Sequence, residues 1–416
     1  MEILEGYMKK SLLVLSLVLA AIAILGLAVA GCGSTTTTAA PSGSTTTAAP
    51  SGSTTTAAPA GGDIIVGAIL SVTGKYAGGE AGINNGTKMA IDEINAAGGV
   101  NGQKLVLSVE DSGSEQAGAV NAYNRVVSKN PLFIVDSAVS SFVLAQMADI
   151  QKAAIPTYAM GESPAVTAQG NPWVLRFSTP DNVTPVAAIQ YVLDDLKKTK
   201  VALVYVNNDF GKTWNDAIVA EMTKRSMTLA TVQVFGADDK DMTAQLTKVK
   251  SAGCDAMIVA ADPNTHAVML KQRIQLGLAG VTYVGSNTAV QPQTLDLLTG
   301  GEAKGIYALT SSVPPEDPDP AVKAWNDKYK GLFKIDADYI AADAYDAVMV
   351  TVDAIKAVGP DKTKVKDWIL ANVKNRKGMG NVWTFSPNGD GGTQVSIAQV
   401  NDQNKAIILK TFAATK

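Results

Sequence analysis

Residues 63–112 read DIIVGAILSVTGKYAGGEAGINNGTKMAIDEINAAGGVNGQKLVLSVEDS. The stretch opens with an apolar run, Ile64–Leu70, which is typical of a β-strand. After a glycine-rich turn, apolar residues recur at helical spacing through Met89–Ile94, and Gly98–Gly99 ends that helix. A second strand then closes near Asp111. Strand, helix and strand in this order predict the unit of a parallel α/β sheet.

The rest of the chain repeats this alternation of apolar strands and amphipathic helices. The predicted strands are Leu105–Val109, Leu132–Val135, Ile155–Tyr158, Val174–Phe177, Val201–Val206, Leu229–Val234, Ala256–Val259 and Thr282–Gly285. Helical periodicity lies between them, over Val183–Lys197, Gly211–Arg225 and Thr243–Ser251. This rhythm predicts doubly wound sheets, in which a ligand sits beyond the carboxyl ends of the strands. The loops after the strands are therefore the predicted location of a binding site.

The first residues indicate export. Two lysines precede an uncharged run rich in leucine and alanine, Ser11–Ala30, whose length alone allows a membrane anchor or a signal peptide. The sequence VAGC that follows within residues 29–32 is similar to a bacterial lipobox, in which small residues fit the signal peptidase and the cysteine takes a lipid. We interpret residues 1–31 as a lipoprotein signal peptide and Cys32 as the lipidated residue, with an uncleaved anchor as the alternative. Either interpretation places the chain at the outer face of a bacterial membrane.

Residues 32–62 form a predicted tether. Ser34–Gly43 reads STTTTAAPSG and is followed by two near-copies that end at Gly62, without a charge or a large apolar residue. Such a composition cannot form a hydrophobic core, so we expect a disordered linker. Its prolines should make the linker stiffer and longer than a glycine-rich coil. The threonines are candidate sites for O-glycans, and a bare spacer is the alternative. The chain after Gly62 is too long for one ordinary core and suits two lobes.

The charge balance argues against nucleic-acid binding, and the cysteine content argues against a disulfide within the exported part. The chain has 35 lysines and arginines against 38 acidic residues, which gives a formal charge of −3, and it has no basic cluster that would suit nucleic acid. Cys254 is the only cysteine after Cys32, so no disulfide can form within the exported part. We expect Cys254 to be a small buried residue.

The sequence gives little sign of catalysis or of a bound cofactor. His266 is the only histidine, and its place early in a predicted helix suits a surface or cap residue that could reach the rim of a cleft. No GxSxG nucleophile motif, GxxxxGK[ST] phosphate loop or cluster of histidines and cysteines occurs. We therefore expect no enzymatic activity, no metal and no nucleotide cofactor.

Several segments together resemble a known family. They are Ile64–Asp111, Ser140–Ser141, Arg176–Asp181 and Gly380–Asp390, and they resemble the periplasmic binding proteins of the leucine/isoleucine/valine family, also called type 1 solute-binding proteins. The similarity extends over nearly all of residues 63–416. It implies two doubly wound α/β lobes joined by three hinge strands, with a ligand cleft between the lobes.

The resemblance also implies where the chain passes between the lobes. Carried over from the family, the three crossings fall at Phe177–Thr179, Leu309–Ser311 and Trp383–Phe385. One lobe would hold residues 63–178 and 310–382, including a helix over Tyr339–Val358, and the other would hold residues 179–309 and 383–416. Three hinge strands allow opening and closing, which is the motion expected of a protein that traps its ligand.

In the first lobe, two loops match the family's ligand contacts. Val139, Ser140 and Ser141 stand where relatives use serine and backbone N–H groups to hold a ligand carboxylate, and the serines also suit caps of the following helix. The loop Gly161–Ser163 stands where relatives offer a threonine or serine, and Glu162 takes that place here. A Glu162 side chain that points to solvent is the alternative.

Four positions depart from the family pattern. Phe210 stands where amino-acid binders have a ligand-facing tyrosine, and Asn287 where they have the acid that binds an ammonium group. Asp262 replaces an aromatic residue but also suits an N-cap, since Pro263 follows it. Gly79 replaces a tyrosine and would leave room for a larger or more polar ligand. Because added carboxylates need a compensating group, we expect a small polar metabolite, with amino acids and amides first.

The resemblance implies a monomeric binding protein that delivers a small molecule to the permease subunits of an ATP-binding cassette importer. A tethered sensor that presents its liganded form to a membrane receptor is the alternative within the same fold. An enzyme would require turnover that depends on Glu162, Asp262 or His266.

Overall fold

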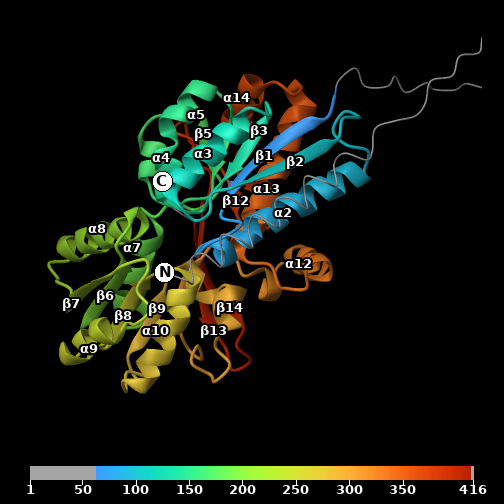
Figure 1. The fold of residues 1–416 in the computed structure, drawn as a ribbon. Helices are drawn as coiled ribbons and strands as arrows, with labels where there is room; N and C mark the ends of the chain where they lie inside the picture. Colours follow the sequence, from blue (N-terminus) through green and yellow to red (C-terminus); the bar gives the residue numbers. More distant parts are fainter. Residues whose placement is uncertain (1–61, 414–416) are drawn as a thin grey trace, which may run out of the picture. The chain divides into compact units, whose positions relative to one another are not determined.

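The computed structural model describes residues 62–413. The predicted signal peptide, the predicted lipidation site Cys32 and the predicted tether up to residue 61 lie outside the described residues. None of the helices within residues 62–413 combines the length and the apolar character that a membrane span requires. This part of the chain contains two large β-sheets, each with helices on both faces (Figure 1).

The first sheet has five parallel strands in the order β2-β1-β3-β4-β5. They are β1 (Ile64–Leu70), β2 (Leu105–Asp111), β3 (Phe133–Asp136), β4 (Thr157–Ala159) and β5 (Val174–Arg176). One face packs against α2 (Ala77–Ala96) and α13 (Tyr339–Val358). The other packs against α3 (Gln116–Val127), α4 (Ser140–Ala145) and α5 (Met147–Ala153). The strand order reverses between β1 and β3, which opens a crevice at the carboxyl ends of these strands.

The second sheet repeats this topology and extends it. Its parallel part has the order β7-β6-β8-β9-β10, and two antiparallel strands continue it beyond β10. The strands are β6 (Val201–Val206), β7 (Thr231–Phe235), β8 (Ala256–Ala260), β9 (Thr282–Gly285), β10 (Tyr307–Thr310), β13 (Gln394–Val400) and β14 (Ala406–Ala413). One face packs against α9 (Thr243–Ser251) and α10 (Pro263–Gln275). The other packs against α7 (Thr184–Gln190), its π-helical continuation Tyr191–Asp195, and α8 (Asp209–Lys224).

Shorter elements complete the described part. They are α6 (Ala165–Ala168), the 3-10 turns Asn287–Val290 and Pro314–Glu316, α11 (Pro292–Leu295), α12 (Pro320–Phe333), α14 (Lys362–Asn372) and the hairpin of β11 (Arg376–Lys377) with β12 (Val382–Trp383). Helix α14 packs against α13, and α12 contacts α2.

The predicted α/β alternation is confirmed. Strands β6 and β9 and helices α9 and α13 have the predicted bounds. Strand β4 begins at Thr157 rather than Ile155, because Pro156 between them has no N–H to donate to a neighbouring strand. The predicted helix over Val183–Lys197 ends at Asp195 after its π-helical turn.

Hydrogen bonds hold three segments side by side between the sheets. The Thr179 hydroxyl donates to the backbone carbonyl of Gln394 (2.7 Å), and the Gln394 side-chain amide donates to the carbonyl of Ser311 (2.8 Å). Asn381 donates from Nδ2 to the Thr179 hydroxyl (3.0 Å) and accepts at Oδ1 from the backbone N–H of Gln394 (3.0 Å). The first two predicted crossings therefore meet Gln394 at the start of β13, while the exact lobe boundaries remain a prediction.

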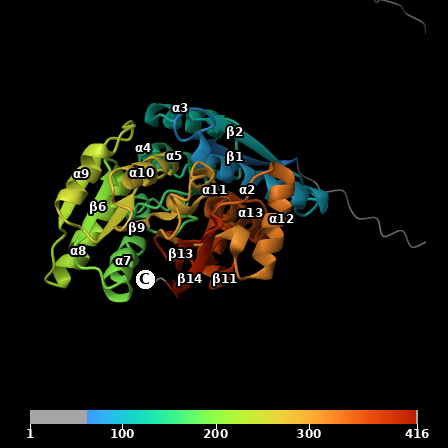
Figure 2. The same cartoon turned by 90° about the horizontal axis from the view of Figure 1, so that it is seen from below.

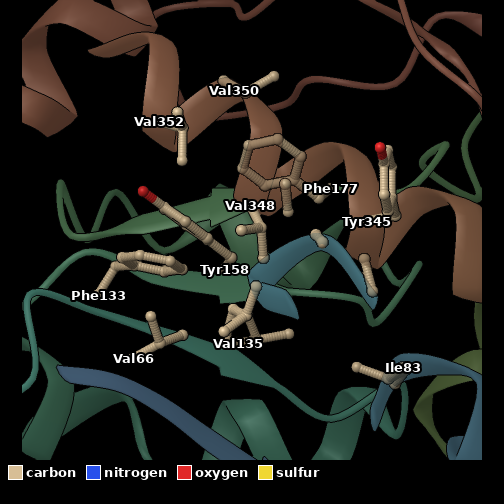
Figure 3. Packing of buried hydrophobic residues seen from close by; sticks show 14 of the residues in the cluster. Val66, Ile83, Phe133, Val135, Tyr158, Phe177, Tyr345, Val348, Val350 and Val352 are labelled. Carbon is tan, nitrogen blue, oxygen red and sulfur yellow. The ribbon is translucent and has the colours of Figure 1, made fainter. Parts of the chain in front are cut away.

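A row of aromatic rings runs through the core of the first sheet toward these segments. Phe133 stacks on Tyr158 with 5.2 Å between ring centroids, and Tyr158 lies 4.9 Å from Phe177. Phe177 lies 5.1 Å from Trp383 and 4.9 Å from Phe385. Figure 3 shows the ring of Tyr158 between those of Phe133 and Phe177. The row anchors the predicted first and third crossings in one core.

Helices α2 and α13 approach closely because two glycines of α2 face α13. Gly82 and Gly86 lie four residues apart and so on one face of the helix. A Cβ at Gly82 would overlap the Asp338 carboxylate, and one at Gly86 would overlap the carbonyl oxygen of Ala341. Figures 1 and 2 both show α2 beside α13. The close contact brings the start of α13 to the carboxyl end of the first sheet.

A methyl group at Gly86 should disrupt this contact. We expect Gly86→Ala to lower the free energy of unfolding by about 1–3 kcal/mol, because overpacking forces the two helices apart. Gly331→Ala in α12 is the matched control, since a Cβ there meets nothing within 4 Å. The control should be neutral or more stable by about 0.5–1 kcal/mol. Chemical denaturation measures both variants, and equal stability would contradict the packing argument.

Candidate functional site

A cavity lies where the carboxyl ends of the two sheets face each other. It encloses about 1020 Å³ of empty space, part of which is open to solvent. One wall comes from the loops after β1, β3 and β4 and from the start of α13, and the opposite wall from the loops after β6, β8 and β9. Each wall therefore contains the point where the strand order of its sheet reverses, which is the usual ligand position in such sheets.

Most of the predicted site residues line this cavity. Eight of the ten do so, namely Gly79, Val139, Ser140, Ser141, Glu162, Phe210, Asp262 and Asn287. Gly161 and Ser163 do not line the cavity. A Cβ at Gly161 would come within 2.9 Å of the Ser140 hydroxyl, and the N–H of Ser163 donates to that same hydroxyl (3.2 Å). These two residues therefore support the loop, and the binding role of all ten remains a prediction.

The two serines are used differently. Helix α4 starts at Ser140 with Val139 as its N-cap residue, and no side chain caps it, so the expectation that the serines cap this helix was wrong. The Ser140 hydroxyl accepts from the Ser163 N–H and joins α4 to the loop after β4. The Ser141 hydroxyl has no hydrogen-bond partner within residues 62–413, and the residue lines the cavity. Ser141 is therefore the one that is available to a ligand.

Glu162 and Asn287 bridge the two walls. Glu162 is 9% exposed and Asn287 is 4% exposed, so the alternative that Glu162 points to solvent was wrong. Asn287 Nδ2 donates a short hydrogen bond to Glu162 Oε1, while Asn287 Oδ1 accepts from the backbone N–H of Thr288 (2.8 Å). In the family pattern, an acidic residue stands at the position of Asn287. Here that position holds an amide, and the carboxyl group of Glu162 faces it from the other wall.

Burial controls the ionisation of Glu162. Loss of hydration raises its pKa to about 7, and the hydrogen bond from Asn287 and the charge of Arg176 only partly offset this effect. Asp181, which is buried nearby and accepts from Trp214 Nε1 (2.9 Å), also has a raised pKa because of burial and the charge of Glu162.

Arg176 at the end of β5 holds the Glu162 loop in place from behind. Its side chain is fully buried, and its guanidinium donates to the backbone carbonyls of Glu162 (2.5 Å) and Ser163 (2.8 Å). It also donates to the Thr167 hydroxyl (2.6 Å) and pairs with Asp390 (2.8 Å). The guanidinium thus fixes the backbone of the site loop rather than neutralising the Glu162 side chain.

Glu80 is a site residue that the sequence analysis missed. It lies in the first turn of α2, is 2% exposed, and lines the cavity. Its carboxylate accepts from the backbone N–H of Ser71 (2.5 Å), from the Ser137 hydroxyl, and from the backbone N–H of Ala138 (2.8 Å). Glu80 therefore ties the loops after β1 and β3 together at the switch point. The only feature of the sequence that could have indicated its role is an acidic residue among glycines in the first turn of a predicted helix.

Aromatic rings supply the apolar part of the cavity. Phe210 comes from the second residue of α8, and Tyr76 and Tyr339 line the opposite wall. Neither tyrosine was predicted as a site residue, although Tyr76 precedes Gly79 by three positions and Tyr339 begins a predicted helix. At Gly79, a Cβ would lie 3.9 Å from Pro263 of the facing wall, so a larger side chain there would meet Pro263.

Asp262 combines a structural role with a place on the wall. Its side chain caps α10 by accepting from the backbone N–H (3.0 Å) and the hydroxyl (2.7 Å) of Thr265, and Pro263 is the first helical residue. The N-cap interpretation is confirmed. Asp262 also lines the cavity, so the two interpretations are compatible.

His266 does not reach the cleft rim, contrary to expectation. The ring is fully buried, with Nδ1 2.6 Å from the Tyr283 hydroxyl and Nε2 3.0 Å from the Ser286 hydroxyl. Burial lowers its pKa to about 3, which keeps the ring neutral. The first turn of α10 turns this position toward the sheet, so the histidine packs between α10 and β9 as a structural residue.

The sequence matches a known protein family over most of the chain. Residues 63–405 match the family described as periplasmic binding protein. The chain belongs to this family. The predicted resemblance and the predicted type 1 periplasmic binding protein fold are thereby confirmed.

Individual relatives agree with this assignment. The Leu/Ile/Val-binding protein BraC3 of Rhizobium johnstonii is 28% identical over 299 residues, which cover 71% of this chain and 80% of that protein. The isoleucine complex of the substrate-binding protein LivJ from Streptococcus pneumoniae is similar at a TM-score of 0.76 and 24% identity, covering 84% of this chain and 99% of that one. A solute-binding protein from Rhodopseudomonas palustris BisB5, in complex with 3,4-dihydroxybenzoic acid, has a TM-score of 0.77 at 20% identity and covers 85% and 98%. Ligands of unlike chemistry thus occur on this fold.

In this periplasmic binding protein, further polar contacts join the two sides of the cleft. The Ser163 hydroxyl lies 3.3 Å from that of Thr213, and Gln293 Nε2 donates to Asp338 (3.0 Å). At the outer edge, Lys75 after β1 forms an ion pair with Asp238 after β7 (2.8 Å), and this partner raises the pKa of Lys75. The two walls of the cleft are therefore in direct polar contact.

The Lys75 ion pair should favour the closed form of the unliganded protein. We expect Asp238→Asn to increase the radius of gyration measured by small-angle X-ray scattering at low salt, because it removes an attraction across the cleft. High salt should reduce the difference from the wild-type protein, since exposed charges are screened. Asp195→Asn is the control, because the Asp195 pair with Lys410 (3.2 Å) lies beside the second sheet. The same change in both variants would argue against a cleft-specific effect.

The cap at Asp262 makes a separate prediction about stability. Asp262→Ala should lower the free energy of unfolding by about 1 kcal/mol, because the backbone N–H and the hydroxyl of Thr265 lose their acceptor. Asp262→Asn should stay near the wild-type value, since asparagine caps about as well. Chemical denaturation without ligand measures both. Equal destabilisation by the two substitutions would mean that the charge, and not the cap, stabilises the protein.

Proposed function

We propose that this protein is an extracytoplasmic solute-binding lipoprotein that captures a small polar metabolite and delivers it to an ATP-binding cassette importer. The observation that carries the proposal is the cavity between the switch points of the two sheets. Hydrogen bonds between the two walls, from Asn287 to Glu162 and from Gln293 to Asp338, hold these walls together. Such a site can enclose a ligand, and its residues show no catalytic constellation within the described part of the chain. Membership of the periplasmic binding protein family supports the same conclusion.

The proposed capture mechanism is hinge closure. The lobes would be residues 63–178 with 310–382, and residues 179–309 with 383–416, and the hydrogen-bonded segments around Thr179 would act as the hinge. Opening would break the contacts of Asn287, Gln293 and Lys75 across the cleft while leaving both cores intact. Ligand that binds only the closed form shifts the population toward it.

The proposed location rests on the sequence before residue 62. The VAGC sequence and the lipid on Cys32 would hold the protein at the outer membrane face, and the threonine- and proline-rich tether would give it reach. A lipid-anchored monomer could then meet permease subunits without leaving the membrane surface.

The proposed ligand is an amino acid or an amide. Its polar groups would meet the Ser141 hydroxyl and the carboxylates of Glu162 and Asp262, and its apolar part would face Phe210, Tyr76 and Tyr339. Buried polar groups without partners are costly, so a ligand that satisfies them gains affinity.

A thermal-shift screen tests the proposed function. The panel would contain amino acids, amides, polyamines, aromatic acids and sugars. A ligand at a hundred times its dissociation constant should add about 2.7 kcal/mol to the stability of the protein. Stabilisation by one class, together with a smaller radius of gyration in its presence, would support capture by closure. No response to any class would contradict the proposed function.

Ser141 offers a sharper test once a ligand is found. Ser141→Ala should weaken binding by about 1–3 kcal/mol, because a buried polar group of the ligand loses its partner. The unliganded protein should keep its stability, since the Ser141 hydroxyl has no partner within residues 62–413. Ser140→Ala is the comparison, because it removes an acceptor of the Ser163 N–H and should lower stability. Calorimetry and denaturation separate the two effects, and unchanged affinity would remove Ser141 from the site.

A further inference from the structure

Glu162 is a buried carboxyl group on the cavity wall without a counter-ion. Its Oε1 accepts from Asn287, and its other oxygen has no hydrogen-bond partner within residues 62–413. No lysine or arginine of this part of the chain forms an ion pair with it. The charge of Arg176 lowers the pKa of Glu162, but the guanidinium does not form an ion pair with it. Its N–H groups bind backbone carbonyls, Thr167 and Asp390 instead. The carboxyl group therefore needs a partner from outside the chain.

A buried carboxyl group in this position has two stable states. It can keep its proton, because an unpaired charge in a poorly hydrated site is costly. It can also ionise when a positive group enters and forms a charge-assisted hydrogen bond with it. In the empty protein, burial raises the pKa of Glu162 to about 7, so both states are populated near neutral pH.

We propose that Glu162 is a specificity-determining residue that holds the ammonium group of an amine-bearing ligand, and that ligand binding displaces the carboxyl proton into solvent. The inference rests on the proposed function and adds the chemical class of the ligand and a proton exchange. The O–H bond of the Glu162 carboxyl breaks, the proton passes to buffer, and the carboxylate pairs with the ammonium group.

The rest of the cavity wall suits a positive group. Asp209 and Asp262 line the wall that faces Glu162. Lys75 is the only lysine or arginine among the lining residues, and it is turned to Asp238. The faces of aromatic rings also attract cations, and Tyr339 lies on the same cavity. An ammonium group next to Glu162 would therefore meet attraction from both walls, whereas an anionic group at the same position would meet repulsion.

Other charged and titratable groups around Glu162 do not replace the ligand. Arg176 and Asp181 face it from β5 and the loop that follows, and Tyr339 and Asp343 face it from α13. Asp181 and Asp343 are fully buried, do not line the cavity, and have raised pKa values because of burial. Tyr339 stays neutral because burial also raises its pKa. Among these groups only Arg176 carries a positive charge, and its guanidinium is hydrogen-bonded to Asp390, Thr167 and two backbone carbonyls.

The sign of the proton exchange distinguishes ligand classes. An amine-bearing ligand requires the carboxylate, so binding releases a proton and weakens as pH falls below 7. From a pKa of about 7, affinity at pH 6 should be roughly tenfold weaker than at pH 8. A carboxylate ligand would instead accept a hydrogen bond from protonated Glu162, so binding would retain or take up a proton and weaken as pH rises.

Isothermal titration calorimetry of the full chain tests this inference. Putrescine, agmatine, L-lysine and L-leucine serve as amine probes, and benzoate and 4-hydroxybenzoate as acid probes. Titrations at pH 7 in buffers of different ionisation enthalpy give the number of protons exchanged. We expect binding of an amine probe with release of a substantial fraction of one proton, and the roughly tenfold loss of affinity between pH 8 and pH 6.

Matched variants assign the proton to Glu162. Glu162→Gln keeps an acceptor for Asn287 but removes the charge, so proton release should vanish and amine affinity should fall at least tenfold. Asp181→Asn keeps an acceptor for Trp214 and should retain proton release. The buffer comparison on the wild-type protein needs no variant, so it decides the question even if Glu162→Gln folds poorly.

Four results would overturn the inference. Amine binding without proton release, or proton release that survives Glu162→Gln, would remove Glu162 from the role while leaving the proposed function intact. Binding of the benzoates alone, with proton uptake, would replace the ligand class and again leave the function intact. Binding of neither class would reject the inference, and the wider thermal-shift panel would then show separately whether the protein captures another kind of solute.

Discussion

The buried guanidinium of Arg176 is the interaction on which the site depends. A fully buried positive charge is tolerated only when its donors are satisfied, and Arg176 meets this requirement with Asp390, Thr167 and the carbonyls of Glu162 and Ser163. One side chain thus joins the end of β5, the site loop after β4 and the turn before β13. If one of these segments moved away, the buried charge of Arg176 would lose a partner. The loop that carries Glu162 therefore has little freedom to move alone.

Two sheets of the same topology explain why the cavity has two similar walls. The orders β2-β1-β3-β4-β5 and β7-β6-β8-β9-β10 each place a switch point at the carboxyl ends of the strands. Within each sheet, apolar helices cover both faces, so the polar loops at these ends are the surface that remains for recognition. The chemistry of the walls then follows from a few side chains, and here carboxylates outnumber free cations.

Local patterns in the sequence predicted much of the fold. The bounds of β6, β9 and α9 follow from the apolar pattern of their own residues, because alternation and helical periodicity are properties of neighbouring residues. The site residues Ser141, Phe210 and Asp262 were predicted from the resemblance to the family, and each lies just after a strand of the predicted sheets. Tyr76 and Glu80 were missed, since nothing in a glycine-rich turn shows which of its side chains will face inward.

The sequence by itself determined the α/β class, the family and the set of loops that reach the cavity, because these depend on local periodicity and on short motifs. Only the tertiary structure decided that Glu162 meets Asn287, 125 residues away, and that His266 turns inward instead of toward the rim. It also decided that Arg176 leaves the Glu162 side chain without a counter-ion. Burial and long-range pairing set the ionisation of such groups, and neither is encoded in the spacing of residues along the chain.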